Sequence, residues 1–188
     1  MDDRTLNRKG LTMKSATVLG LGLLAFVSGA ALAPALLSED RTDRSHFWMD
    51  VQGAHRATAT GRVAYGPVGR PGEAGASFTI TLGAQDAKGA VVFTRLDGTM
   101  PDPGRYPIAN TDTMDRVGGW HALYLAGSAT KPEGVFQADA GMIEITSATE
   151  GRISGHFELT GTGFLADSPE DESRHVTVRG SFDSQLLP

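Results

Sequence analysis

Cysteine is absent from the chain, and this absence narrows the chemistry available to the protein. It excludes disulfides, thiolate metal sites, a thiol nucleophile and a lipid attached through cysteine. Motifs that activate serine or bind zinc are also missing, since no G-x-S-x-G, H-x-H or H-E-x-x-H stretch occurs. We therefore predict that the protein is not an enzyme and holds no cofactor.

Histidines remain as candidate general bases, but the sequence identifies no carboxylate partner for any of them. Histidines at 156 and 175 follow an alternation that turns them away from the apolar side of a strand. Solvent-facing or rim positions are the simplest interpretation for the set. Its members are His46, His55, His121, His156 and His175.

Positive charge is scarce beyond the first residues. The net charge of the 188-residue chain is −5, yet residues 1–14 carry two net positive charges, which leaves seven net negative charges on the rest. An acidic protein with scattered cations repels phosphate backbones, so no nucleic-acid partner is expected. With 24 glycines and 9 prolines, the composition fits one turn-rich globular domain behind an N-terminal segment.

The only long apolar stretch spans residues 16–37, which contain no charged side chain. A helix rising ~1.5 Å per residue would let this stretch cross a ~30 Å hydrocarbon core. Cations precede it, in residues 1–15, so the positive-inside rule places the N-terminus in the cytoplasm and the remainder outside. We expect an extracytoplasmic, periplasmic-side domain, attached to the inner membrane if the segment is retained.

Two interpretations of residues 16–37 stay open. Small residues at 28–33 resemble a signal-peptidase site, and a chain read from Met13 looks like a compact signal peptide. Against cleavage, Pro34 directly follows the best site, and the twelve residues before Met13 are unusually long and mixed in charge. These signals slightly favour a transmembrane anchor. Residues 38–56 are then interpreted as a juxtamembrane linker, and residues 57–188 as the folded domain.

Hydrophobic residues in the domain recur with a period of two, which is typical of half-buried strands. Turn residues such as Gly83, Gly98 and Gly141 separate the segments, and no window of ten residues shows helical periodicity. We predict an all-β, antiparallel sandwich or small barrel of about 8–9 strands, preceded by one transmembrane or signal helix. The predicted strands are 58–65, 77–82, 90–96, 105–108, 120–126, 135–138, 142–146, 153–159 and 176–182.

The last third combines the stretches IEITS (143–147), GRISGHF (151–157) and VTVRGSF (176–182). This combination resembles the ending of uncharacterised bacterial secreted or lipoprotein β-sandwich domains. The resemblance covers about 40 residues and implies a fold but no activity. Gly155 and Gly180 each stand two positions before a phenylalanine, which suggests that each lies beneath a ring packed from a neighbouring strand.

Oxygen-bearing residues gather in one long connection, where Asp102, Asp112 and Asp115 form a weak candidate calcium site. The spacing fits poorly because Met114 occupies a position that needs an oxygen, so an ordinary surface loop is favoured. The aromatic stretch Phe47, Trp48 and Met49 has two equal interpretations. It is either a surface for a partner or the membrane interface, or a plug for one end of the domain core.

These features predict a non-enzymatic accessory or scaffolding subunit, anchored in the membrane by residues 16–37. Its domain would pack on the outer face of a larger membrane-protein complex, such as a respiratory or photosynthetic assembly. The alternative is a secreted or periplasmic calycin-like barrel that encloses a small apolar ligand. A hydrolase based on the acidic loop is a third, weaker hypothesis.

Overall fold

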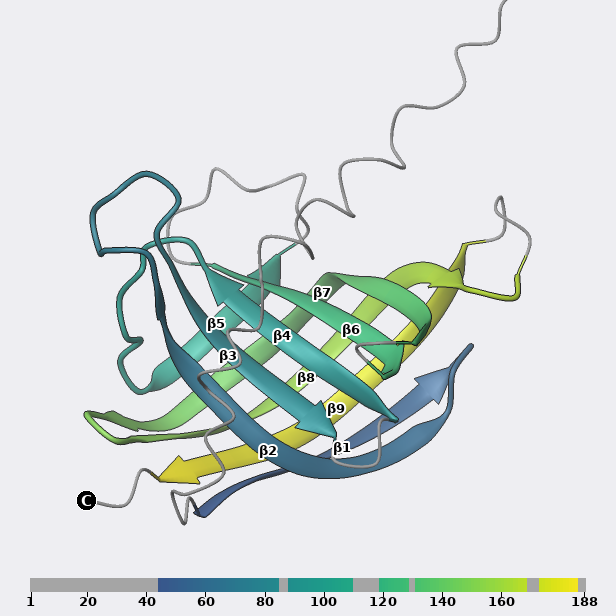
Figure 1. Ribbon diagram of the computed structural model, residues 1–188, viewed down its shortest axis with the longest axis horizontal. Coiled ribbons are helices and arrows are strands. Elements are labelled where there is room, and N and C mark those ends of the chain that lie inside the picture. The colour runs from purple at the N-terminus through teal and green to yellow at the C-terminus, as the bar shows by residue number, and fades with distance from the viewer. Residues whose placement is uncertain (1–43, 85–87, 110–118, 129–130, 169–172, 186–188) are drawn as a thin grey trace, which may run out of the picture. The chain divides into compact units, whose positions relative to one another are not determined.

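The computed structural model describes residues 44–84, 88–109, 119–128, 131–168 and 173–185, all within the compact unit Asp40–Pro188 (Figure 1). These residues form strands and turns only, so the all-β prediction is confirmed for them. None of the described residues belongs to a helix long and apolar enough to cross a membrane. The predicted span at 16–37 lies outside the described residues.

The described residues form nine strands. They are β1 (Arg44–Gly53), β2 (Ala57–Val68), β3 (Ser77–Ala84), β4 (Gly89–Arg95), β5 (Gly104–Ala109), β6 (Trp120–Gly127), β7 (Pro132–Thr149), β8 (Arg152–Leu165) and β9 (Arg174–Gln185).

Hydrogen bonds join the strands into one closed ring in the order β1-β2-β3-β4-β6-β5-β7-β8-β9 (Figure 1). All neighbours are antiparallel except β5 and β6, which meet in parallel at a single register pair, Ile108 and Trp120. The first half of β7 pairs directly with β6, and its second half pairs with β5. A register shift between Ala138 and Ala140 marks the change of partner, as expected for a bulge that bends a strand.

Two predictions made from the sequence are corrected here. Residues 44–53, inside the predicted linker 38–56, form β1, which pairs with both β2 and β9 and closes the ring. Residues 135–138 and 142–146 are not separate strands, because β7 runs through both and through Gly141, predicted as a turn. The long strand is continuous because β8 pairs with it from Gly134 to Thr149, on both sides of Gly141.

The interior of the ring is built by alternation, with one side chain of every two pointing inward. At two positions inside the ring a phenylalanine faces a glycine of the neighbouring strand. Phe182 of β9 faces Gly155 of β8, and Phe157 of β8 faces Gly180 of β9. A Cβ atom added to Gly155 or Gly180 would lie 2.8 Å from the facing ring, so the predicted packing of glycine beneath phenylalanine is confirmed.

We predict that Gly155→Ala lowers the free energy of unfolding by about 3 kcal/mol, because the new methyl group overlaps the Phe182 ring and the Glu144 carbonyl. Gly83→Ala is the matched control, since a Cβ atom there meets nothing within 4 Å. Urea unfolding of both variants measures the difference. Equal stability of the two variants would contradict the packing described here.

Candidate functional site

The aromatic stretch at the start of the domain splits between two environments. Phe47 and Met49 are 1% and 0% exposed and belong to the core, whereas Trp48 is 42% exposed on the outer face of β1. The cause is the period of two in a strand, which sends neighbouring side chains to opposite faces. The prediction that Phe47 and Met49 form a partner or membrane interface is therefore wrong, and only Trp48 is accessible.

The acidic loop is described only in part. Asp102 is exposed, and its backbone carbonyl accepts a hydrogen bond from the Tyr106 hydroxyl at 2.7 Å. Asp112 and Asp115 lie outside the described residues, so the calcium prediction stays untested. Among the residues that the structure covers, no group of three His, Asp or Glu side chains could hold a metal ion.

Histidines at 156 and 175 are exposed on the outer face, as predicted. Nδ1 of His175 lies 3.0 Å from the Thr162 hydroxyl, which donates a hydrogen bond to the Asp139 carboxylate. This group joins β7, β8 and β9 on an exposed face. The Thr162 hydroxyl therefore bridges the Asp139 carboxylate and the His175 imidazole across the three strands.

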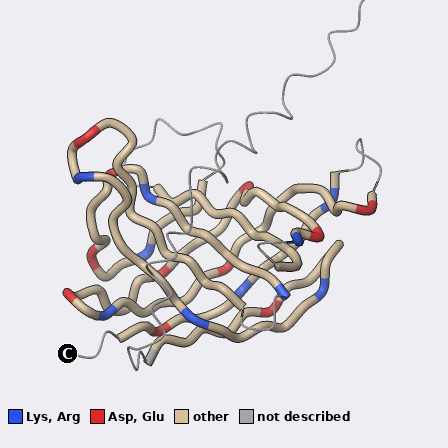
Figure 2. The backbone as a smooth tube through the Cα atoms, viewed as in Figure 1, with Lys and Arg blue, Asp and Glu red and all other residues tan. Residues whose placement is uncertain are grey.

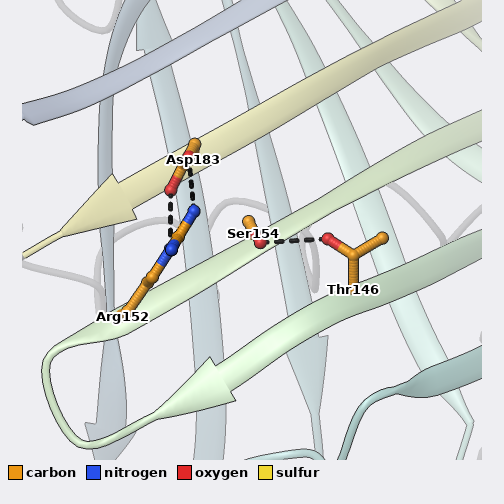
Figure 3. Close-up of polar contacts among 4 residues, drawn as sticks. All are labelled: Thr146, Arg152, Ser154 and Asp183. Carbon is orange, nitrogen blue, oxygen red and sulfur yellow. Dashed lines mark hydrogen bonds and ion pairs between the residues drawn. The ribbon is translucent and has the colours of Figure 1, made fainter.

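A second polar group lies on the outer face near the β7–β8 turn (Figure 3). The Arg152 guanidinium donates to both carboxylate oxygens of Asp183, at 3.4 and 3.0 Å. The hydroxyls of Thr146 and Ser154 lie 2.9 Å apart. The Arg152–Asp183 contact connects β8 with β9 and the Thr146–Ser154 contact connects β7 with β8, so we interpret the group as a structural link between the three strands.

Large side chains occupy the interior of the ring. Phe93 packs against Phe157 with ring centroids 5.0 Å apart, and Phe78 packs edge-on against Trp120 at 6.3 Å. Tyr124 and Phe136 stack at 6.0 Å farther along the interior. The largest fully buried side chains are Trp120, Tyr124, Phe47, Phe78, Phe93, Phe136, Met49, Ile80, Leu82, Ile143, Ile145 and Ile153.

One part of the outer face is unexpectedly apolar. Six side chains on adjacent strands point outward from β4, β6, β7 and β8, and we call them the outer strip. Register pairs connect Ala90 to Leu125, Leu125 to Val135, and Val135 to Phe164, while Val92 pairs with Leu123 in the next row. Phe164 is 51% exposed and the others are half-buried. The outer strip consists of Ala90, Val92, Leu123, Leu125, Val135 and Phe164.

The remaining outer faces follow the usual pattern for a solvated antiparallel sheet. Outward residues of β3 are Ser77, Thr79 and Thr81, and outward positions of β9 alternate between hydroxyl-bearing and charged side chains. Charged residues of both signs are interspersed along the chain (Figure 2). The outer strip is therefore a local departure from the rule. Two of its members are visible in the sequence, because Leu123 and Leu125 alternate with the apolar residues Ala122 and Tyr124 and so indicate apolar side chains on both faces of this strand.

A buried tyrosine and a histidine pair at the end of the ring where β1 and β6 end. There the hydroxyl of Tyr124, which is fully buried, lies 2.7 Å from Nδ1 of His55 in the β1–β2 turn. Burial, and to a smaller extent the negative charge of Glu133, raise the pKa of the Tyr124 hydroxyl above its ordinary value of 10. The phenol therefore stays protonated, and its oxygen and Nδ1 of His55 share a hydrogen bond whose direction follows the histidine tautomer.

Glycine at position 89 makes room for this pair. A Cβ atom there would lie 3.1 Å from the Tyr124 hydroxyl and 3.0 Å from its ring. His55 lines a cavity of about 470 Å³ that opens beside it. The sequence indicated rim positions for histidines but not this pairing, because residues 55 and 124 are brought together only by closure of the ring.

Comparison of the chain with protein-family models, with characterised proteins and with solved structures finds no match.

The raised pKa of Tyr124 predicts a pH-dependent stability. The unfolded chain loses the Tyr124 phenol proton near pH 10, whereas the folded state retains it. The contribution of this group to the free energy of unfolding is therefore fully present below pH 10 and decreases as the pH rises above 10. Above pH 10 the free energy of unfolding of the wild-type chain should therefore fall as the pH rises. In Tyr124→Phe this fall should be less steep, by up to about 1.4 kcal/mol per pH unit. Urea titrations at pH 8 to 11 measure it, and an unchanged alkaline slope would contradict the assignment.

Proposed function

We propose that this protein is a non-enzymatic accessory subunit, anchored on the outer side of a membrane, that docks on a partner protein through the outer strip. The observation that carries the proposal is the placement of six uncharged apolar side chains on adjacent strands, where the outer face of an antiparallel sheet is normally polar. Contiguous exposed apolar surface is typical of interaction sites.

The filled interior supports a function on the outside. We infer that the closed ring is a small, filled barrel rather than two separate packed sheets, because hydrogen bonding continues around all nine strands. Aromatic rings inside such a barrel take the volume that an enclosed apolar ligand would need. This argues against the calycin-like alternative and leaves the outer surface and the rim for binding.

The charge of the chain favours a particular kind of partner. Residues 15–188 carry seven net negative charges, so two copies brought face to face would repel each other. A partner with an apolar patch bordered by basic side chains complements both the outer strip and this charge. We therefore propose a different protein with that chemistry, in a membrane complex, rather than a second copy of this chain.

The N-terminal segment 16–37 is the basis for the membrane part of the proposal. Trp48 is a second accessible aromatic, on the outer face of β1 and away from the strands that carry the outer strip. It provides a matched comparison because it is exposed to a similar degree as Phe164 but lies among polar neighbours, Thr60 and Ser181.

The double variant Leu125→Thr/Phe164→Thr tests the proposal. Both changes are on the outer face, so we expect them to shift the unfolding midpoint little. Recovery of a co-purifying protein from detergent-solubilised native membranes should fall at least about tenfold. Trp48→Thr should retain the partner. Raising the salt concentration should weaken the wild-type complex, because salt screens the attraction between the partner's basic side chains and this acidic chain.

Chemical cross-linking before solubilisation and native mass spectrometry identify what is bound. A distinct protein that is lost from the double variant and retained by Trp48→Thr is the expected result. Three results would reject the proposal: a monomer without a partner, a complex made only of copies of this chain, or a partner lost from Trp48→Thr but not from the double variant.

A further inference from the structure

A pocket of about 530 Å³ lies on the hairpin that β1 and β2 form with the turn between them. Its volume is in the range of small-molecule sites, but those sites are mostly lined by apolar side chains. Here the lining supplies a carboxylate, an amide, a guanidinium and a hydroxyl beside two aliphatic residues. A lining of this composition suits a ligand rich in hydroxyl groups. The lining residues are Asp50, Val51, Gln52, Arg56, Ala57 and Thr58.

Trp48 stands beside this pocket on the outer face of β1. Alternation along the strand turns Trp48 and Asp50 to the same side, roughly 7 Å apart. The indole is 42% exposed, whereas the residues before and after it in the chain are buried in the core. A flat apolar surface therefore borders a polar pocket.

The row of side chains that crosses the sheet at Trp48 is polar apart from the indole. Its members come from β2, β1, β9, β8 and β7, and each is half-buried or exposed. Because neighbouring strands lie ~4.8 Å apart, the row spans roughly 19 Å, which accommodates an extended chain molecule. The row consists of Thr60, Trp48, Ser181, His156 and Glu144.

Charge in and around the pocket is balanced. Nε2 of Gln52 donates to a carboxylate oxygen of Asp50 at 2.8 Å, and the Arg179 guanidinium lies 3.4 Å from the same oxygen. Within the lining, the carboxylate of Asp50 and the guanidinium of Arg56 carry opposite formal charges. The acidic character of the whole chain repels polyanions, whereas an uncharged ligand is not affected by it.

From these observations we propose that the outer face of the β1–β2 hairpin binds an uncharged saccharide chain. A sugar ring has a face of C–H groups that packs flat on an aromatic ring, and Trp48 provides that ring. Sugar hydroxyls both donate and accept hydrogen bonds, and they match the carboxylate of Asp50, the amide of Gln52 and the guanidinium of Arg56. None of these residues belongs to the outer strip, so the proposal is independent of the docking function.

Fluorescence titration of the full chain, in a detergent without a sugar headgroup, tests the proposal. The chain has two tryptophans, and Trp120 is fully buried, so quenching by iodide reports on Trp48. The probes are cellohexaose, chitohexaose and maltohexaose, which are all uncharged. We expect at least one of them to bind saturably and to reduce iodide quenching at least about twofold, because a stacked sugar ring shields the indole.

Calorimetry of variants separates stacking on the indole from contacts in the pocket. Trp48→Thr should weaken saccharide binding at least about tenfold, since the stacking surface is lost. Gln52→Ala/Arg56→Ala keeps the indole and should weaken binding at least about fivefold, since hydrogen bonds are lost. Phe164→Thr is the matched control, because this 51% exposed aromatic lies on β8, which β9 separates from the hairpin. It should change the affinity less than about twofold.

The proposal is overturned if none of the three hexasaccharides binds saturably, or if Phe164→Thr weakens binding as much as Trp48→Thr. It is also overturned if iodide no longer quenches Trp48 in the chain reconstituted into phosphatidylcholine vesicles without saccharide, because that result assigns the indole to the bilayer surface.

Discussion

Closure of the hydrogen-bonded ring by β1 is the constraint on which the other features depend. The strand pairs with β9 along all ten of its residues and with β2 over five. Closure leaves no unpaired strand edge between β9 and β2, where pairing with another molecule would otherwise occur. It also places Phe47 and Met49 inside the ring, and it brings the β1–β2 turn, with His55, to the hydroxyl of Tyr124.

A filled ring determines where binding can take place. Because bulky inner side chains face glycines on neighbouring strands, aromatic rings pack closely inside the ring. Surface chemistry differs by location, with hydroxyl-bearing and charged groups on β3 and β9 and apolar groups in the outer strip.

The period of two made most of the strands predictable, and the glycine-before-phenylalanine spacing indicated the core packing of Gly155 and Gly180. Residues 44–53 escaped prediction because their position after an apolar segment suggested a linker, although Phe47, Met49 and Val51 already alternate with polar residues. The sequence indicates Leu123 and Leu125 of the outer strip, but neither the strip as a whole nor the Tyr124–His55 pair was predictable. Both depend on which strands become neighbours, and a single sequence carries no direct signal of pairing between distant segments.

Hydrogen–deuterium exchange of the β1 amides tests the central claim most directly. A strand bonded on both sides opens only when the ring opens, so amides of residues 47–51 should exchange as slowly as those of β8 and β9, near the limit set by global unfolding. Rapid exchange across residues 47–51, with β8 and β9 still protected, would show that this segment is a linker and that the ring is not closed as described.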